Sequence, residues 1–460
     1  MPLSIILGTL VILTLIGFYM GRSRAVASSS GDIRILHSLP GYYGYFVAIW
    51  CGVPALLVAA GWLAFEPQIV QGLLISSLPE DVQKLSDNRL KLVLNDIMNI
   101  AAGGIASKKP DPEILKAAEY YNSLKSTGSV ALAGVMFALA VAGITYARSK
   151  INPDLRARNN VEKFIMVILI ASSTIAILTT VGIVFSLLFE SLRFFQKVAP
   201  VDFLFGLEWS PQTALRSDQV GSTGLFGAVP LFVGTLLISF IAMCVAAPVG
   251  LLSAIYMAEY APYKVRAALK PMLEILAGIP TVVYGFFAAL TVAPFFRDLG
   301  ASGGIMISSE SALAAGVVMG IMIIPFVSSI ADDVITAVPQ AMREGSLGLG
   351  ATKSETIKRV ILPAALPGIV GGLLLAVSRA IGETMIVVMA AGLAAKLSVN
   401  PLEAVTTVTV QIVTLLVGDQ EFDSAKTLAA FALGLLLFCV TLVLNIIALT
   451  VVNKYREQYE

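Results

Sequence analysis

Charged side chains are scarce in this chain of 460 residues. Asp, Glu, Lys and Arg make up 13% of it, whereas soluble domains typically contain about 25%. Hydrophobic residues make up 57%. The net charge of +1 gives no basic surface of the kind that binds nucleic acid. The composition therefore excludes an ordinary soluble domain and predicts an integral membrane protein whose surroundings are lipid.

Cysteine and histidine are also rare. The three cysteines, Cys51, Cys244 and Cys439, all fall in apolar runs, which predicts neither a disulfide framework nor a metal cluster. The single histidine, His37, lies near a predicted membrane edge and receives no role. We therefore expect no metal site, no cofactor and no catalytic residue in this chain.

Apolar runs of membrane-spanning length are what the sequence has instead. A helix needs about 20 apolar residues to cross a bilayer, and the sequence predicts an all-α fold with nine such spans. No Lys or Arg precedes the first run and no convincing cleavage site follows it, so we expect it to be retained. The predicted spans are 3–20, 42–64, 128–147, 164–190, 225–257, 272–296, 312–331, 365–393 and 428–452.

The basic residues near the ends of the spans predict the orientation. Three arginines follow the first span and no basic residue precedes it, which places the N-terminus outside. Counting forward from there, residues 65–126 lie outside. The loops 148–163 and 332–364 and the C-terminus lie in the cytoplasm.

A polar segment, residues 339–363, interrupts two of the apolar runs. It contains Glu344, then Gly350 six residues later, and ends on Leu362 and Pro363. This spacing resembles the EAA loop of ABC-importer permeases, with Gly-Ser in place of the two alanines that follow the glutamate. The EAA loop is the cytoplasmic coupling loop on which a separate ATPase subunit lies. The resemblance implies that these four residues belong to the ATPase contact.

The residues of this segment also predict its local structure. Pro339 suits the first turn of a short helix over 340–349, and Gly350 permits a sharp turn. Thr352 and Glu355 form a capping-box pattern for a second helix over 353–362. We expect a compact docking element with four exposed basic residues: Arg343, Lys353, Lys358 and Arg359.

Two further motifs, residues 274–285 and 378–385, resemble the phosphate-specific branch of these permeases, and the second is closer to the PstC type than to its partner PstA. The resemblance covers about 160–455. It implies a six-span ABC-importer permease core, residues 151–460, preceded by about three extra N-terminal spans. Residues 1–150 resemble the N-terminal extension of the long PstC form, with the external insert 65–126.

The resemblance implies a channel-forming subunit of an ATP-driven phosphate importer in the bacterial inner membrane. Its implied partners are a second permease of PstA type, two copies of a cytoplasmic ATPase and a periplasmic phosphate-binding protein. The stretch Gly350-Ala-Thr-Lys353-Ser354 lacks the Gly-Lys-Ser/Thr adjacency that holds nucleotide phosphates. We therefore expect the chain not to be an enzyme itself.

Two charges within the predicted span 365–393, Arg379 and Glu383, are candidates for the substrate pathway. A charge at the bilayer centre costs about 3 kcal/mol, and residues four apart share a helical face. Arg379 offers a planar fork of donors suited to phosphate oxygens, while Glu383 can neutralise it or accept a proton from phosphate. A structural ion pair explains the two charges equally well.

Pro280 and Thr281 are weaker candidates for the pathway. Pro280 interrupts an apolar span, removes a helical hydrogen bond and frees a carbonyl. Broken helices often line transport pathways, although simple kinks are at least as common.

Two alternatives to phosphate import stay open at this point. The substrate can be another oxyanion, such as sulfate or molybdate. The chain can instead be an ion-coupled secondary transporter that uses Arg379 and Glu383. The segment 339–363 separates these classes, because a secondary transporter has no use for an ATPase contact.

Overall fold

The computed structural model describes six stretches of the chain: residues 2–29, 32–83, 85–104, 112–213, 223–417 and 423–455. Within them, nine helices are long and apolar enough to cross a membrane, which confirms the predicted number of spans. Residue 84 and residues 105–111 of the predicted insert lie outside these stretches. The chain divides into two compact units, Met1–Ile177 and Leu178–Glu460.

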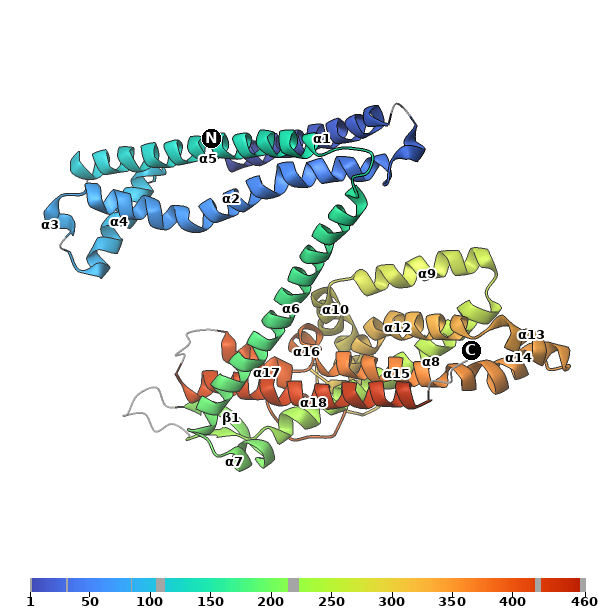
Figure 1. Ribbon diagram of the computed structural model, residues 1–460. Helices are drawn as coiled ribbons and strands as arrows, with labels where there is room; N and C mark the ends of the chain where they lie inside the picture. Colours follow the sequence, from blue (N-terminus) through green and yellow to red (C-terminus); the bar gives the residue numbers. More distant parts are fainter. Residues whose placement is uncertain are drawn as a thin grey trace. The chain divides into compact units, whose positions relative to one another are not determined.

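Three long helices form the first unit: α1 (Leu3–Ser28), α2 (Pro40–Ser77) and α5 (Pro112–Ser149) (Figure 1). They pack closely because small residues let the backbones approach. A Cβ atom added to Gly143 would lie 2.0 Å from the carbonyl oxygen of Trp50. The short helices of this unit are η1 (Ile33–Ile35), α3 (Glu80–Gln83) and α4 (Asp87–Ala101).

Helix α4 belongs to the predicted insert and packs against the extended ends of α2 and α5. Its residues Leu94 and Ile97 are buried in a cluster with Leu74 of α2. The predicted span 42–64 is therefore only the first part of the longer helix α2, and the predicted span 128–147 is the last part of α5.

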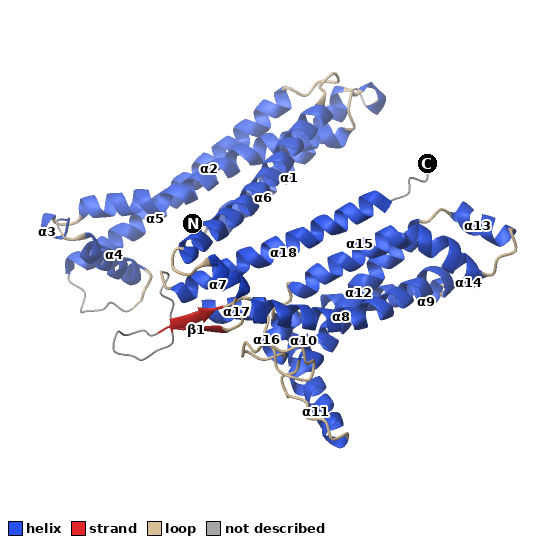
Figure 2. Cartoon of the chain, turned by 90° about the horizontal axis from the view of Figure 1, so that it is seen from below, coloured by secondary structure: helices blue, strands red, loops and turns tan. Residues whose placement is uncertain are grey.

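Helix α6 (Ala157–Phe195) contributes its first part to the first unit and its last part to the second. In the second unit, α8 (Val229–Ile255) and α12 (Ala312–Ala337) form the centre (Figures 1 and 2). Of the most apolar stretch of α12, 61% is buried, which makes α12 the core helix of this unit. The other helices here are α7 (Pro200–Phe205), η2 (Tyr256–Tyr260), α9 (Tyr263–Gly278), α10 (Thr281–Phe287), η3 (Ala288–Val292), α11 (Ala293–Ser302), α13 (Gln340–Gly348), α14 (Lys353–Thr356), η4 (Ile357–Ile361), α15 (Leu362–Ile381), α16 (Met385–Ala390), α17 (Val408–Leu416) and α18 (Ala425–Tyr455).

A two-stranded hairpin is the exception to the helical architecture in the described stretches. Strands β1 (Trp209–Thr213) and β2 (Thr223–Phe226) pair antiparallel, with Trp209 opposite Phe226. Trp209 also donates from Nε1 to Oε1 of Gln411 in α17 at 2.9 Å. The predicted span 225–257 therefore begins late, at Val229, because the preceding residues are in a strand.

Two predicted spans are interrupted. The prediction of one span over 272–296 is wrong, because α9 ends at Gly278 and the membrane-length helix begins at Thr281. The span predicted over 365–393 ends at Ile381, and only the short α16 follows. Both breaks interrupt otherwise apolar runs, so the hydropathy averaged over each run does not show where the helix ends.

Candidate functional site

A cavity of about 240 Å³ lies inside the second unit, between α9, α12 and α15. On α12 its lining residues recur at intervals of three or four, so that one helical face is turned toward it. The same holds for α9. The lining residues are Met257, Lys270, Leu273, Glu274, Ala277, Met322, Pro325, Phe326, Ser329, Asp332 and Arg379.

Arg379 lies at one end of this cavity, where residues from the middle of α12 form the wall. Its guanidinium carbon is 5.4 Å from the centroid of the Phe326 ring, in a cation–π contact. The side chain is exposed in this chain rather than buried in an ion pair. It therefore provides a positive charge and several hydrogen-bond donors to the cavity.

The predicted pairing of Arg379 with Glu383 on one helical face is wrong. Helix α15 ends at Ile381, so Glu383 lies in the break that follows. Its Oε1 accepts from the backbone N–H of Met385 at 3.1 Å, and Thr409 donates from Oγ1 to its carbonyl oxygen at 2.9 Å. In the part of the chain that the structure describes, no ion pair joins Arg379 and Glu383.

Pro280 and Thr281 lie at the other break, where Pro280 precedes the first residue of α10. Pro280 has no N–H to donate to the carbonyl of Leu276, which accepts from the N–H of Ile279 at 3.3 Å instead. Tyr284 donates from its hydroxyl to that carbonyl at 2.9 Å. The freed carbonyl is thus satisfied within the chain and is not an open ligand for a substrate.

The structure brings the two breaks together. Helix α10 packs on α16 at Gly285, where an added Cβ would lie 2.9 Å from Cγ of Met389 and 3.1 Å from the carbonyl oxygen of Met385. Each of these helices begins directly after a break. Two broken helices that pack beside a charged cavity form the arrangement expected of a transport pathway.

Sequence reasoning missed one cluster of charges, at the other end of the cavity. An aspartate pair at the end of an apolar run is typical of solvated carboxylates, but Asp332 is only 1% exposed. Nη2 of Arg266 lies 3.0 Å from both of its carboxylate oxygens, and Nζ of Lys270 lies 3.3 Å from Oδ2. The hydrogen bond to Asp332 raises the pKa of Lys270, which lies outside the nine spans. Asp333, the neighbour of Asp332, is 68% exposed, and Oδ1 of Asp333 lies 3.5 Å from Nζ of Lys270.

A signal for this cluster was present in the sequence. Arg266 and Lys270 are four residues apart, and therefore share one face of α9. Two basic residues on one helical face indicate an acidic partner, but the sequence does not show that this partner is Asp332, 62 or more residues away.

The coupling segment, residues 339–363, has the predicted turn and caps. Helix α13 runs over Gln340–Gly348, and Gly350 has a positive φ of 87°. The capping box is complete, because Thr352 accepts from the N–H of Glu355 while the Glu355 carboxylate accepts from the N–H of Thr352. The helix predicted to end at 362 instead continues through η4 into α15, with Leu362 and Pro363 in the first turn of α15.

The surface of the coupling segment carries three of the four basic residues expected there, because Lys353, Lys358 and Arg359 are exposed. Glu344 is exposed, and Leu347 and Leu349 are 50% and 92% exposed. Arg343 was expected to be exposed, but its side chain is only 16% exposed and lies 3.2 Å from the Glu259 carboxylate. The segment, which lies at one end of the second unit (Figures 1 and 2), therefore exposes an acidic residue and two leucines beside its three basic side chains.

The coupling segment is attached to η2 at two points. Besides the Arg343–Glu259 ion pair, Nζ of Lys353 lies 4.9 Å from the ring centroid of Tyr260. Arg343 also donates from Nη2 to the carbonyl oxygen of Ile335 in α12, at 2.7 Å. These contacts attach the coupling segment to η2, which follows α8, and to the last turns of α12.

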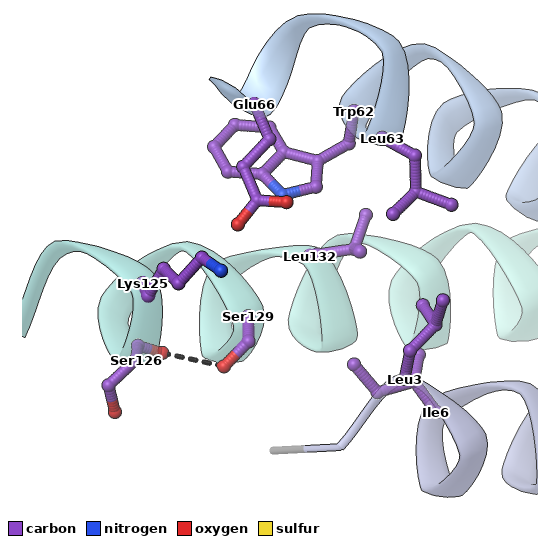
Figure 3. A pocket seen from close by; sticks show the side chains of 9 residues that line it. All are labelled: Leu3, Ile6, Trp62, Leu63, Glu66, Lys125, Ser126, Ser129 and Leu132. Carbon is purple, nitrogen blue, oxygen red and sulfur yellow. Dashed lines mark hydrogen bonds between the residues drawn. The ribbon is translucent and has the colours of Figure 1, made fainter. Parts of the chain in front are cut away.

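The first unit contains a separate pocket of about 290 Å³ (Figure 3). Figure 3 shows Glu66 of α2 and Lys125 of α5 near apolar side chains of all three long helices. Ser129 donates from its hydroxyl to the carbonyl oxygen of Ser126 at 2.8 Å. One acidic and one basic residue line this pocket, and no arginine does. Its lining residues are Leu3, Ile6, Trp62, Leu63, Glu66, Lys125, Ser126, Ser129 and Leu132.

Two family descriptions match separate regions of the chain. Residues 246–457 match the binding-protein-dependent transport system inner membrane component. Residues 7–179 match a family described as phosphate ATP-binding cassette transporter. The second match covers the N-terminal region, in which the sequence showed no functional motif.

Three individual relatives match this chain over similar numbers of residues and at similar sequence identity. The probable ABC transporter permease protein YqgH of Bacillus subtilis is 33% identical over 276 residues, which are 60% of this chain and 85% of that protein. The phosphate transport system permease protein PstC 1 of Mycobacterium tuberculosis is 33% identical over 277 residues, or 55% of this chain and 81% of that protein. The phosphate transport system permease protein PstC of Mesorhizobium japonicum is 32% identical over 265 residues, which are 54% of this chain and 76% of that protein.

These relatives are covered over most of their length, and the family match includes the cavity, both breaks and the coupling segment. The resemblance seen in the motifs is thereby confirmed. The chain belongs to the binding-protein-dependent ABC-importer permeases and is a permease of PstC type.

Proposed function

We propose that this chain is the channel-forming permease subunit of an ATP-driven importer that moves inorganic phosphate across the bacterial inner membrane. The observation that carries the proposal is Arg379, which faces a cavity beside two broken helices. A guanidinium group binds phosphate oxygens through two parallel hydrogen bonds. The names of the PstC relatives support phosphate as the anion.

The other proposed pathway residues, Glu383, Pro280 and Thr281, lie at the two helix breaks, and their proposed roles follow from these positions. Glu383, in the break after α15, accepts the proton that phosphate carries and that sulfate lacks. Pro280 and Thr281 shape the pathway by setting where α10 begins, because the Leu276 carbonyl is already satisfied. Their contribution is therefore geometric, whereas that of Arg379 is a direct contact.

The energy for transport comes from partners in this proposal. Two copies of a cytoplasmic ATPase act below a pair formed by this chain and a PstA-type permease, and a periplasmic phosphate-binding protein delivers the anion from above. One ATPase docks on the coupling segment through Glu344 and the turn at Gly350, with Leu362 and Pro363 joining the segment to α15. The exposed Leu347 and Leu349 support this, since exposed apolar side chains grouped on a short helical element indicate a protein contact.

The function is tested with the purified complex in proteoliposomes. We expect uptake of radiolabelled phosphate that needs ATP, the ATPase subunit and the phosphate-binding protein together. Sulfate in tenfold excess serves as the competing anion and is expected to leave phosphate uptake unchanged. Uptake driven by an ion gradient without ATP would instead identify a secondary transporter.

The proposed orientation has its own test. The N-terminus and the insert 65–126 lie outside, residues 1–150 form the extension and 151–460 form the core. Cysteines at Lys91 in α4 and at Leu349 are compared in a background without native cysteines. In intact spheroplasts an impermeant maleimide is expected to label position 91 and not position 349, although both side chains are exposed. Labelling of position 349 from outside contradicts both the orientation and the ATPase contact.

A further inference from the structure

Four charged residues line the Arg379 cavity: Lys270 and Asp332 at one end, Arg379 at the other, and Glu274 of α9. Phe326, which contacts Arg379, and Asp332 are six residues apart on α12, or about 9 Å along the axis. Helix α12 ends at Ala337, five residues beyond Asp332, and the coupling segment follows at Pro339. The cluster of Asp332, Arg266 and Lys270 thus lies at the end of the cavity nearest the coupling segment.

The cations of this cluster are accessible, whereas the carboxylate is not. Asp332 is 1% exposed, but the side chains of Arg266 and Lys270 are 32% and 40% exposed. Lys270 lines the same cavity as Arg379. An anion leaving Arg379 therefore meets Lys270 before it reaches Asp332.

The bond between Arg266 and Asp332 does not use the best geometry of an arginine. Both carboxylate oxygens are met by the single nitrogen Nη2, at 3.0 Å each. The strong arrangement is a fork in which two nitrogens donate in parallel to two oxygens. A tetrahedral oxyanion that accepts from two nitrogens of Arg266 in parallel is therefore bound in the stronger geometry, and competes with Asp332 for this guanidinium group.

We propose that Arg266 and Lys270 form a second binding station for phosphate, at the end of the cavity nearest the coupling segment, and that the Asp332 carboxylate occupies this station until phosphate displaces it. The inference rests on the proposed phosphate transport. Asp332 has two effects here: it neutralises two cations when no substrate is present, and it keeps phosphate from binding there too tightly to leave. The station also joins α9 to α12, the helix that leads directly into the coupling segment.

The station is tested by phosphate protection of a cysteine in the cavity. Ser329 lines the cavity and is exposed, so Ser329→Cys in a cysteine-free background reacts with an anionic thiol reagent in the nucleotide-free complex. Phosphate is expected to slow this reaction. Asp332→Asn removes the competing charge and lowers the half-protecting phosphate concentration about fivefold, the factor that ~1 kcal/mol gives at a partly exposed site. Lys270→Gln raises it by about the same factor.

Two matched controls lie on the same helices. Lys264→Gln removes a charge from α9 outside the cavity. Asp333→Asn removes the exposed neighbour of Asp332, whose Oδ1 lies 3.5 Å from Nζ of Lys270 and thus makes the weaker, solvent-exposed ion pair with the same cation. Both are expected to change half-protection less than about twofold, because exposed charges are screened. Equal effects of Asp333→Asn and Asp332→Asn contradict the proposal.

ATP-dependent uptake separates a station from a structural ion pair. Lys270→Gln is expected to lower uptake at least about fivefold while the complex assembles and hydrolyses ATP. The double variant Lys270→Gln with Asp332→Asn balances the charges and should assemble, yet its uptake should stay low because a cation is missing. If the double variant restores wild-type uptake, the cluster is structural. Uptake by the double variant therefore distinguishes a binding station from a structural ion pair even if Asp332→Asn alone does not assemble.

The same experiments distinguish the two proposals. If the wild-type complex takes up no phosphate, the proposed function fails. If uptake is present and needs Arg379, while the Lys270 and Asp332 variants behave like the controls, only the second station is wrong.

Discussion

Replacing Gly350 with valine is expected to uncouple ATP hydrolysis from phosphate uptake by an order of magnitude or more. Gly350 has a φ of 87° at the turn between α13 and α14. This left-handed conformation costs an ordinary residue about 1–2 kcal/mol and a β-branched residue more. Such a cost reduces the population of the native turn by about tenfold or more. The measurement is the number of phosphate ions moved per ATP hydrolysed, in proteoliposomes that contain equal amounts of assembled complex.

The matched control for this change is Gly348→Val. Both glycines are exposed, and an added Cβ meets no atom within 4 Å at either position, so only the backbone conformation differs. Gly350→Asn should keep most of the coupling, because asparagine tolerates the left-handed region. The ion pair of Arg343 with Glu259 holds α13 in place independently of this turn. If all three variants transport alike, the turn has no part in coupling.

A charge reversal on the same surface acts by a different route. Glu344 is exposed at one end of the second unit, so Glu344→Lys leaves the fold of this chain intact. It is expected to lower the amount of ATPase that co-purifies, whereas Gly350→Val lowers transport per ATP. The two variants thus separate loss of docking from loss of transmission.

The coupling segment could be predicted in detail because its structure is local. The turn at Gly350 and the capping box of Thr352 with Glu355 depend on residues within a few positions of one another. The number of spans was predictable for a similar reason, since each depends on a continuous apolar run. These features need no knowledge of which helices become neighbours.

The break after α15 could not be predicted because distant residues define it. The carbonyl oxygen of Glu383 accepts from Thr409, 26 residues further along the chain. The hydropathy of 382–390 gives no sign that the long helix has ended. The same limit explains Asp332, whose partners Arg266 and Lys270 lie 66 and 62 residues away.

The break also changes how the intramembrane charges are interpreted. With Glu383 outside α15, the alternative of a structural ion pair with Arg379 loses its geometric basis. Arg379 instead contacts the Phe326 ring, which leaves the guanidinium hydrogen-bond donors directed to the cavity or to a substrate. Under the proposed function, a ligand that binds transiently is the reason for its retention in a membrane helix.

Arg379→Ala is therefore expected to abolish phosphate uptake while the complex still assembles. A charge-assisted hydrogen bond contributes about 1.5–3 kcal/mol, so the loss of one such contact to the passing anion lowers the rate by about 10- to 100-fold. Arg379→Lys should restore little, because an ammonium group lacks the planar fork. The measurement is ATP-dependent phosphate uptake, normalised to assembled complex. Arg297→Ala is the control, since Arg297 is a half-exposed arginine of α11 that does not line the cavity.

The double variant Arg379→Leu with Glu383→Leu tests the remaining structural explanation. If the two residues supported each other as an ion pair, removing both charges would restore assembly and uptake, as replacement of buried ion pairs by apolar residues often does. The structure leads to the opposite expectation, because Glu383 is bonded to the N–H of Met385 and not to Arg379. Uptake should stay as low as in Arg379→Ala. Recovery of uptake in the double variant would rule out a direct contact between Arg379 and phosphate.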